Sequence, residues 1–232
     1  MRPDPDIKIY EDLLHENYSQ LNYERGLAAW FMRKSHQWSE KKYVREDHFS
    51  TVLEVGAGTG IHIQQVRHAF DQYIISDIDD RYLKTADVDD VSNFKIVVAT
   101  EDATNLSFPD NSIDRLIAAH VLEHLPNPHL VLKEWHRVLK PGAAMTILLP
   151  CDPGIAWRLG RCLGTRPKDL ELAIEYDYWM AREHINSITN LVSLIRYYFD
   201  DLEENWLPSL IPNIDINLFY ICHIRVSKTR IF

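Results

Sequence analysis

Between residues 50 and 150 the chain repeats one pattern, in which a short apolar run is followed by a longer stretch with helical spacing. The runs are apolar at nearly every residue, which is typical of strands that are buried on both faces. Strands that alternate with helices build a parallel sheet with helices on both sides. The pattern therefore predicts an α/β fold around one open sheet.

Residue periodicity and turn residues give the bounds of the expected elements. We predict strands at 51–55, 73–77, 94–99, 112–120 and 143–150, and helices at 61–70, 80–87 and 128–140, the last stopped by Pro141-Gly142. Two helices joined near Asn22 are expected within residues 7–45, followed after the core by helices at 169–182 and 187–200 and strands at 203–210 and 215–228. The long final strand suits an antiparallel position at the sheet edge.

A length of 232 residues is enough for one well-packed α/β domain. We therefore expect a single domain in four parts. These are an N-terminal helical lid at 1–48, a cofactor-binding core at 49–150, a substrate-covering insertion with helices at 151–200, and final strands at 201–232.

Composition narrows the class of partner and the compartment. A net charge of −9 argues against nucleic acid as the main partner, because phosphate binding needs clustered Lys and Arg. Three cysteines without paired spacing are typical of a reduced compartment and exclude a zinc knuckle. Residues 1–12 lack the apolar core of a signal peptide, and no apolar run is long enough for a transmembrane segment. We expect a cytoplasmic protein.

The sequence VLEVGAGTG, at 52–60, leads from a predicted strand into three glycines at alternate positions. Gly56 permits a tight bend, Gly58 lets a ligand approach the backbone, and Gly60 lets the following helix pack on the strand. The dinucleotide fingerprint has its third glycine one residue later, and a phosphate-binding Walker loop needs a Lys-Ser/Thr pair that is absent here. By itself the motif fits either a ligand-binding turn or a purely structural strand–helix junction.

Acidic residues follow the next two predicted strands. Asp77 ends the second strand about 20 residues after the first glycine, where a carboxylate can accept hydrogen bonds from both hydroxyls of a ribose. Asp102 follows the third strand and can accept from an exocyclic amine. The backbone N–H after it can donate to a ring nitrogen. Together with the glycines, these positions predict a nucleoside-like ligand.

Four stretches, VLEVGAGTG, ISDID, EDATNLSFPDNSIDRLIAAHVLEHLPNP and RVLKPGAAMTILLP, resemble the class I S-adenosylmethionine-dependent methyltransferases. Within that class they resemble the small-molecule branch called methyltransferase type 11. The likeness covers about residues 50–150. It implies a Rossmann-like, seven-stranded, mostly parallel sheet with helices on both faces and an antiparallel last strand. It also implies methyl transfer from S-adenosylmethionine to a small-molecule, glycan or lipid-like acceptor.

The resemblance further implies which residues contact the cofactor. Those expected around its methionine and ribose portion are Gly56, Ala57, Gly58 and Gly60, with His120 and Glu54 near the methionine end. Those expected around the adenosine are Asp77 on the ribose hydroxyls, Ile78 on the adenine face, and Asp102 with Ala103 on the adenine edge. The cofactor's carboxylate is expected near a helix start at Ile61.

The sequence HVLEH, at 120–124, has the order of an inverted zincin motif. A zincin needs a regular helix, whereas these residues follow a buried strand and run into Pro126. We therefore expect Glu123 and His124 to structure the loop, and we expect no metal ligand. Some quinone-type methyltransferases carry an acid at the place of His120 and are thought to use a metal there, an alternative that the histidine disfavours.

Two further segments bear on the acceptor. His184 follows the fifth strand, where the family commonly places substrate-facing residues, so it is the candidate general base, with a structural role as the alternative. Basic residues at 158–168 lie among apolar ones and would suit an anionic or membrane-associated acceptor. The alternative for them is a solvated face with arginines whose stems cover apolar surface.

Two other functions stay open at this point. An NAD-dependent oxidoreductase is disfavoured by the spacing of the glycines. A catalytically silent methyltransferase-like binding partner is disfavoured by the intact set of Gly56, Gly58, Asp77 and Asp102. The sequence names neither the acceptor nor the oligomeric state.

Overall fold

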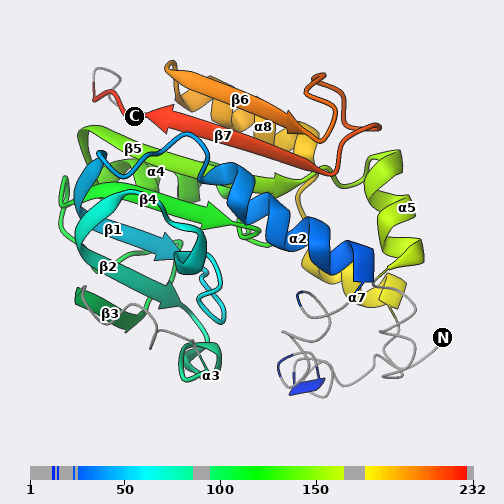
Figure 1. Ribbon diagram of the computed structural model, residues 1–232, viewed down its shortest axis with the longest axis horizontal. Helices are drawn as coiled ribbons and strands as arrows, with labels where there is room; N and C mark the ends of the chain where they lie inside the picture. The colour runs from blue at the N-terminus through cyan, green and yellow to red at the C-terminus, as the bar shows by residue number, and fades with distance from the viewer. Residues whose placement is uncertain are drawn as a thin grey trace.

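The computed structural model describes residues 26–85, 95–164 and 176–228, together with Asp12, Leu13, His15 and Tyr23. Its centre is a seven-stranded sheet in the order β3-β2-β1-β4-β5-β7-β6. The strands are β1 His48–Val55, β2 Ala69–Asp77, β3 Lys95–Thr100, β4 Ile113–Ala119, β5 Leu139–Pro150, β6 Leu202–Leu207 and β7 Phe219–Arg225. Strands β1 to β5 are parallel, and β7 runs antiparallel to both of its neighbours (Figure 1). The predicted fold class is confirmed.

Helices cover both faces of this sheet. They are α2 Gly26–Ser39, α3 Asp80–Leu83, α4 Pro128–Val138, α5 Ile155–Leu163, α7 Tyr176–Glu183 and α8 Ile188–Tyr198, with a short 3₁₀ turn, η2, at Ile63–Gln65. In Figure 1, α2 crosses in front of the sheet while α4 and α8 lie behind it. Among these described helices, none combines the length and apolar character that a bilayer crossing demands.

The apolar side chains of the strands are packed on both faces of the sheet. Leu149 of β5 packs with α4 and α8 in the largest apolar cluster, whereas Leu148 packs with Phe31 and Met32 of α2 in another. Successive residues of a strand point to opposite faces, so an apolar residue at every position needs a cover on both sides. Each side chain removed from water in this way contributes roughly 1.5–3 kcal/mol.

Helix α4 shows how local sequence sets an element. Its residues Val131, Leu132, Trp135 and Val138 are fully buried and recur at helical spacing. Pro128 occupies the first turn, where a missing N–H costs nothing. The helix ends at Val138, two residues before its predicted end, and β5 begins at once. Pro141-Gly142 therefore lies inside β5, close to an irregularity in its register with β4.

The helix predicted at 61–70 is wrong. Only η2 forms there, and β2 already begins at Ala69, which pairs with His48 of β1. Pairing with β1 therefore takes the last residues of the segment into the sheet. His62 is also drawn into the interior and is fully buried. Because this helix does not form, the predicted helix start at Ile61, which was expected to face the cofactor's carboxylate, is also wrong.

The other predicted elements form with shifted bounds. Helix α3 has four residues instead of the eight predicted at 80–87, and the end of that range lies outside the described residues. Helix α8 lies within the predicted range 187–200. Helix α7 overlaps the predicted range 169–182, and the first part of that range lies outside the described residues. Helix α5 was not predicted. Two helices were predicted in the N-terminal region, and α2 corresponds to the second. The range of the first, like the junction at Asn22, lies mostly outside the described residues. The division into four parts stays a prediction.

Candidate functional site

Four of the predicted site positions lie in a row along one edge of the sheet. Asp102 follows β3, Asp77 ends β2, Gly56 follows β1 and His120 follows β4. Because the strand order is β3-β2-β1-β4, these positions succeed one another along the carboxyl ends of adjacent parallel strands. Neighbouring strands are about 4.8 Å apart, so the row spans roughly 14 Å. An elongated ligand such as a nucleoside joined to an amino acid fits this length.

The glycine turn requires its glycines. Gly56, Gly58 and Gly60 have φ angles of 61°, 55° and 72°, in the left-handed region that other residues avoid. A Cβ atom on Gly56 would also lie 2.5 Å from Cγ2 of Val121. The turn is tied to β2, since Ala57 donates its backbone N–H to the Ser76 carbonyl at 2.9 Å. The turn is thus fixed and free of side chains at its three glycines, and its contact with a cofactor stays a prediction.

Asp77 is fixed next to this turn. One carboxylate oxygen, Oδ2, accepts the Gly58 N–H at 2.8 Å, and Oδ1 accepts the Asp79 N–H at 3.0 Å. A carboxylate has about four lone-pair directions, so two remain for the hydroxyls of a ribose. The neighbouring Ile78 is 69% exposed and can cover a flat ring. The geometry fits the roles that the resemblance implies for both residues.

The adenine-edge positions lie in a turn after β3. Asp102 is exposed, and its Oδ1 accepts from the backbone N–H and the hydroxyl of Thr104 at 2.8 and 2.7 Å. The Ala103 carbonyl accepts from Nε1 of the buried Trp135 at 2.9 Å. Helix α4 therefore holds this turn against the sheet. Recognition of an adenine by the two residues stays a prediction.

Glu54 differs from the other predicted residues because it is almost completely buried within β1. The Tyr73 hydroxyl donates to its Oε2 at 2.7 Å. Burial raises the pKa of the Glu54 carboxyl. Its contact with the methionine end of a cofactor stays a prediction, and the structure gives it a partner on β2.

A buried polar network anchors α2 beside the glycine turn, and the sequence analysis missed it. Glu40 accepts from both terminal nitrogens of Arg115 on β4, and it pairs with Nε2 of His62 at 2.9 Å. His62 Nδ1 in turn lies 2.8 Å from His36 Nδ1. Burial alone would raise the pKa of Glu40, but Arg115 and His62 lower it to about 2. An arginine inside an apolar strand, which needs a buried partner, was the available signal.

His120 occupies the end of the row nearest to α2 and β7. Its φ angle of 59° turns the chain sharply after β4, and its Nε2 lies 3.3 Å from the Ser35 hydroxyl. Its ring contacts that of Phe219, with centroids 5.6 Å apart. His120 therefore lies beyond the glycine turn, where the resemblance puts the methionine end.

His184 lies in a second group with the residues of HVLEH. Its Nδ1 is 2.8 Å from Oδ2 of Asp152, and its ring is perpendicular to that of His124 with centroids 4.8 Å apart. Burial would raise the pKa of Asp152, but His184 and Arg161 lower it overall. Asp152 is therefore ionised and holds His184 in one orientation. Glu123 connects the two groups, because its Oε1 lies 3.8 Å from both His120 Nδ1 and His124 Nε2.

Asn186 explains why two distant segments meet here. Its side-chain amide donates to the carbonyls of Leu122 and Leu125 at 3.2 and 2.8 Å, and its backbone N–H donates to the Glu123 carbonyl at 3.1 Å. These bonds join the segment after α7 to a turn after β4. The residues of HVLEH thus form a turn and not a helix, as expected. No sequence pattern pointed to Asn186.

The basic segment contributes one residue to this group. Arg161 of α5 pairs with Asp152 at 2.9 Å and donates to the Tyr176 hydroxyl at 2.5 Å. Its charge is therefore engaged within the protein, which weighs against Arg161 as a clamp for an anionic acceptor. Arg166 and Lys168 of the same segment lie outside the described residues.

Comparison with known proteins agrees with this geometry. Residues 53–147 match the model of a family described as "Methyltransferase domain". The hybrid PKS-NRPS synthetase poxE of Penicillium oxalicum is 28% identical over 168 residues, which are 68% of this chain and 4% of that protein. The ubiquinone/menaquinone biosynthesis C-methyltransferase UbiE of Rickettsia bellii is 35% identical over 103 residues, 40% of this chain and 41% of that protein. The chain thus spans less than half of either relative.

A solved structure shows the same fold. The CurJ carbon methyltransferase is similar with a TM-score of 0.64 and 16% identity, over 92% of this chain and 58% of that one. The matched region, residues 53–147, contains β2, β3 and β4, the end of β1 and most of β5, and it therefore includes the whole row of predicted site positions. This region of the chain is therefore similar to methyltransferase domains, and the chain shares the fold of the CurJ carbon methyltransferase.

Proposed function

We propose that the protein transfers a methyl group from S-adenosylmethionine to a small-molecule acceptor that loses a proton in the reaction. The loss of a proton by the acceptor is inferred from one observation, the distance of 2.8 Å between Nδ1 of His184 and Oδ2 of Asp152. A carboxylate that orients an imidazole is the arrangement used to take up a proton from a reacting group. An acceptor that arrived already deprotonated would need no such pair.

The described residues fit the cofactor. The left-handed turn from Gly56 to Gly60 carries no side chain at its three glycines, and Asp77 is aligned beside it by the Gly58 N–H. Bound S-adenosylmethionine would supply a methyl group on a positively charged sulfur. The chain's own contribution is to align cofactor and acceptor and to exclude water, which contributes several kcal/mol as effective molarity.

The acceptor belongs at the His120 end of the row, because the predicted adenosine positions occupy the other end. There His120, Glu123 and His184 come together from the ends of β4 and the segment after α7. The names of UbiE and CurJ describe carbon methyltransferases, which supports an acidic carbon as the acceptor atom. Small molecules, glycans and lipid-like acceptors all remain within this proposal.

The test is a turnover screen with methyl-labelled S-adenosylmethionine against pooled phenolic, quinone, lipid and glycan acceptors. With the acceptor found, His184→Ala should lower kcat by about 100-fold and leave cofactor binding nearly unchanged. The matched control is His48→Ala, since His48 also pairs with an aspartate, Asp71, but on the exposed surface. Cofactor binding without transfer to any pool would instead favour the catalytically silent binding partner.

A further inference from the structure

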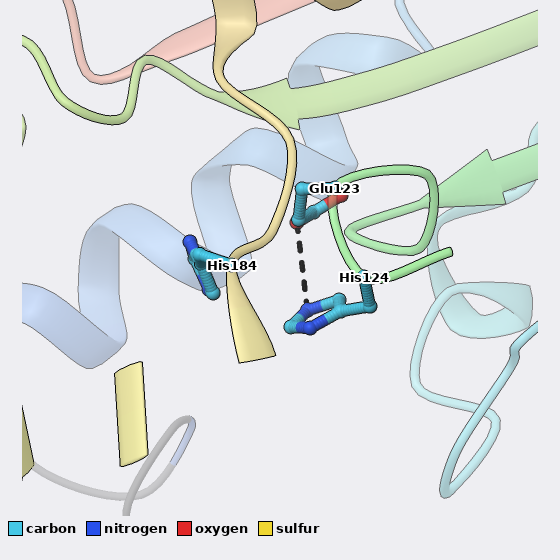
Figure 2. A group of neighbouring side chains, drawn as sticks. All are labelled: Glu123, His124 and His184. Carbon is cyan, nitrogen blue, oxygen red and sulfur yellow. Dashed lines mark ion pairs between the residues drawn. The ribbon is translucent and has the colours of Figure 1, made fainter. Parts of the chain in front are cut away.

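We propose that Glu123, His124 and His184 form a binding site for a divalent transition-metal ion. Each offers one ligand atom, and the three atoms lie within 4.8 Å of one another. Figure 2 shows that Glu123 and His124 come from the turn after β4, and that His184 comes from the segment after α7. The two segments are 60 residues apart in sequence and are joined by the bonds of Asn186.

Both imidazoles are already held as metal ligands usually are. His124 places Nδ1 2.9 Å from the Glu183 carbonyl, and His184 places Nδ1 2.8 Å from Asp152. A ring that donates through Nδ1 to an oxygen presents an unprotonated Nε2, and ligating histidines are typically fixed by such a carbonyl or carboxylate. The two rings therefore direct a free lone pair on Nε2 away from these anchors.

The buried carboxylate of Glu123 gives separate support for a bound cation. Its side chain is only 2% exposed, and its Oε2 has no hydrogen-bond partner within the described part of the chain. The other oxygen, Oε1, lies 3.8 Å from His120 and from His124, which is beyond hydrogen-bond distance. A buried carboxylate is costly unless a charge compensates it directly. A cation beside Glu123 would provide that compensation.

The donor set selects the kind of ion. Two imidazole nitrogens and one carboxylate oxygen are the three protein ligands of many catalytic zinc sites, which keep a fourth position open. Magnesium and calcium prefer sites made of oxygen alone, so Zn²⁺ or a neighbouring transition metal is favoured. Ligands at 2.0–2.1 Å from a tetrahedral ion are about 3.3 Å apart. The three side chains would therefore close by roughly 1 Å when the ion binds.

The ion would act on the acceptor, and in this respect the inference rests on the proposed function. Its open position would face the region near His120 and take an oxygen of the acceptor. Coordination lowers the pKa of a bound hydroxyl, so the acceptor would lose its proton more readily. With its Nε2 on the ion, His184 would be a ligand in place of the base, the acceptor's proton would pass to solvent, and Asp152 would be the positioning residue that orients the ring.

The experiment measures metal binding without cofactor or acceptor. The full-length protein is stripped with a chelator, titrated with Zn²⁺ by calorimetry, and loaded with Co²⁺ to record the visible absorption of a low-coordinate site. We expect one ion per chain. His124→Ala and His184→Ala should each weaken binding by at least 100-fold, and Asp152→Asn by about 10-fold to 100-fold. His48→Ala is the control, and circular dichroism checks that each variant is folded.

Two results would overturn the site: failure of the wild-type protein to bind one ion, or unchanged affinity in the folded His124→Ala and His184→Ala variants. A protein that binds S-adenosylmethionine and transfers the methyl group without any metal site leaves the proposed function intact and contradicts this inference. A protein that binds the ion in the expected way but methylates nothing supports the site and contradicts the proposed function.

Discussion

The backbone N–H of Gly58 donates a hydrogen bond of 2.8 Å to Oδ2 of Asp77. This bond joins the glycine turn after β1 to the end of β2, so the two parts of the motif position each other. Asp77 is therefore aligned by backbone groups of the chain itself. Such preorganisation reduces the entropy lost when a ligand binds.

The contribution of Asp77 can be measured by substitution. Asp77→Ala should weaken S-adenosylmethionine binding by about 2–4 kcal/mol, because two ribose hydroxyls and the Gly58 N–H lose their acceptor. Asp77→Asn should retain more affinity, since it keeps one acceptor oxygen. Calorimetry gives the values, with Asp71→Ala as the exposed control. Wild-type affinity in a folded Asp77→Ala protein would remove this residue from the site.

Gly56 and Gly142 show two different reasons why a position requires glycine. Both have positive φ angles, but a Cβ on Gly56 would strike Val121 whereas nothing lies within 4 Å of one on Gly142. Gly142→Ala should cost about 1–2 kcal/mol of unfolding free energy from backbone conformation alone. Gly56→Ala should cost about 1–3 kcal/mol more from the clash. Denaturant unfolding measures both, and equal losses would show that Val121 yields without cost.

The Glu40–Arg115 pair should be sensitive to removal of one partner. Arg115→Met leaves the Glu40 carboxylate buried without its cation and should cost about 3–5 kcal/mol of stability. Replacing both, as Glu40→Leu with Arg115→Met, should recover part of that loss because no uncompensated charge remains. Denaturant unfolding of the two proteins decides this. A double variant no more stable than Arg115→Met would show that packing, and not the buried charge, dominates.

Buried histidines predict loss of stability in mild acid. Burial lowers the pKa of both His68 and His223 to about 4, whereas an unfolded histidine has a pKa near 6.5. Between these values the unfolded chain binds more protons, so stability is full above pH 6.5 and falls as the pH drops toward 4. At pH 5 each residue should cost about 1–2 kcal/mol.

His223→Gln isolates one of these contributions. The variant cannot titrate at this position, so its unfolding free energy should fall less than that of the wild type between pH 7 and pH 5. The difference between the two slopes is the quantity measured. Parallel curves would show that His223 keeps an ordinary pKa in the folded protein.

Local sequence predicted the sheet well, whereas the binding roles of the predicted site residues stay predictions. Apolar runs located the strands, and Gly56, Asp77 and Asp102 were found from their place at strand ends. Interactions between distant residues caused the errors. Pairing of Ala69 with His48 competes with the helical spacing at 61–70, and a local pattern does not contain it. Glu40 and Arg115 are 75 positions apart, so neither residue reveals its partner.

The same reason applies to the acceptor side. HVLEH was correctly expected to form a loop, but its contact with His184 through Asn186 could not be predicted from the local sequence. The contacts of Asp152, Arg161 and Tyr176 likewise link segments that a linear reading treats separately. The arrangement of side chains at this end of the sheet depends on such tertiary contacts.

Calorimetric titration of the full-length protein with S-adenosylmethionine tests the central claim most directly. A cofactor site built from the glycine turn, Asp77 and the turn at Asp102 predicts saturable binding in the micromolar range, about −7 to −9 kcal/mol, and no binding of NAD. Absence of heat and of thermal stabilisation with S-adenosylmethionine and with its demethylated product, while NAD gives both, would contradict the account.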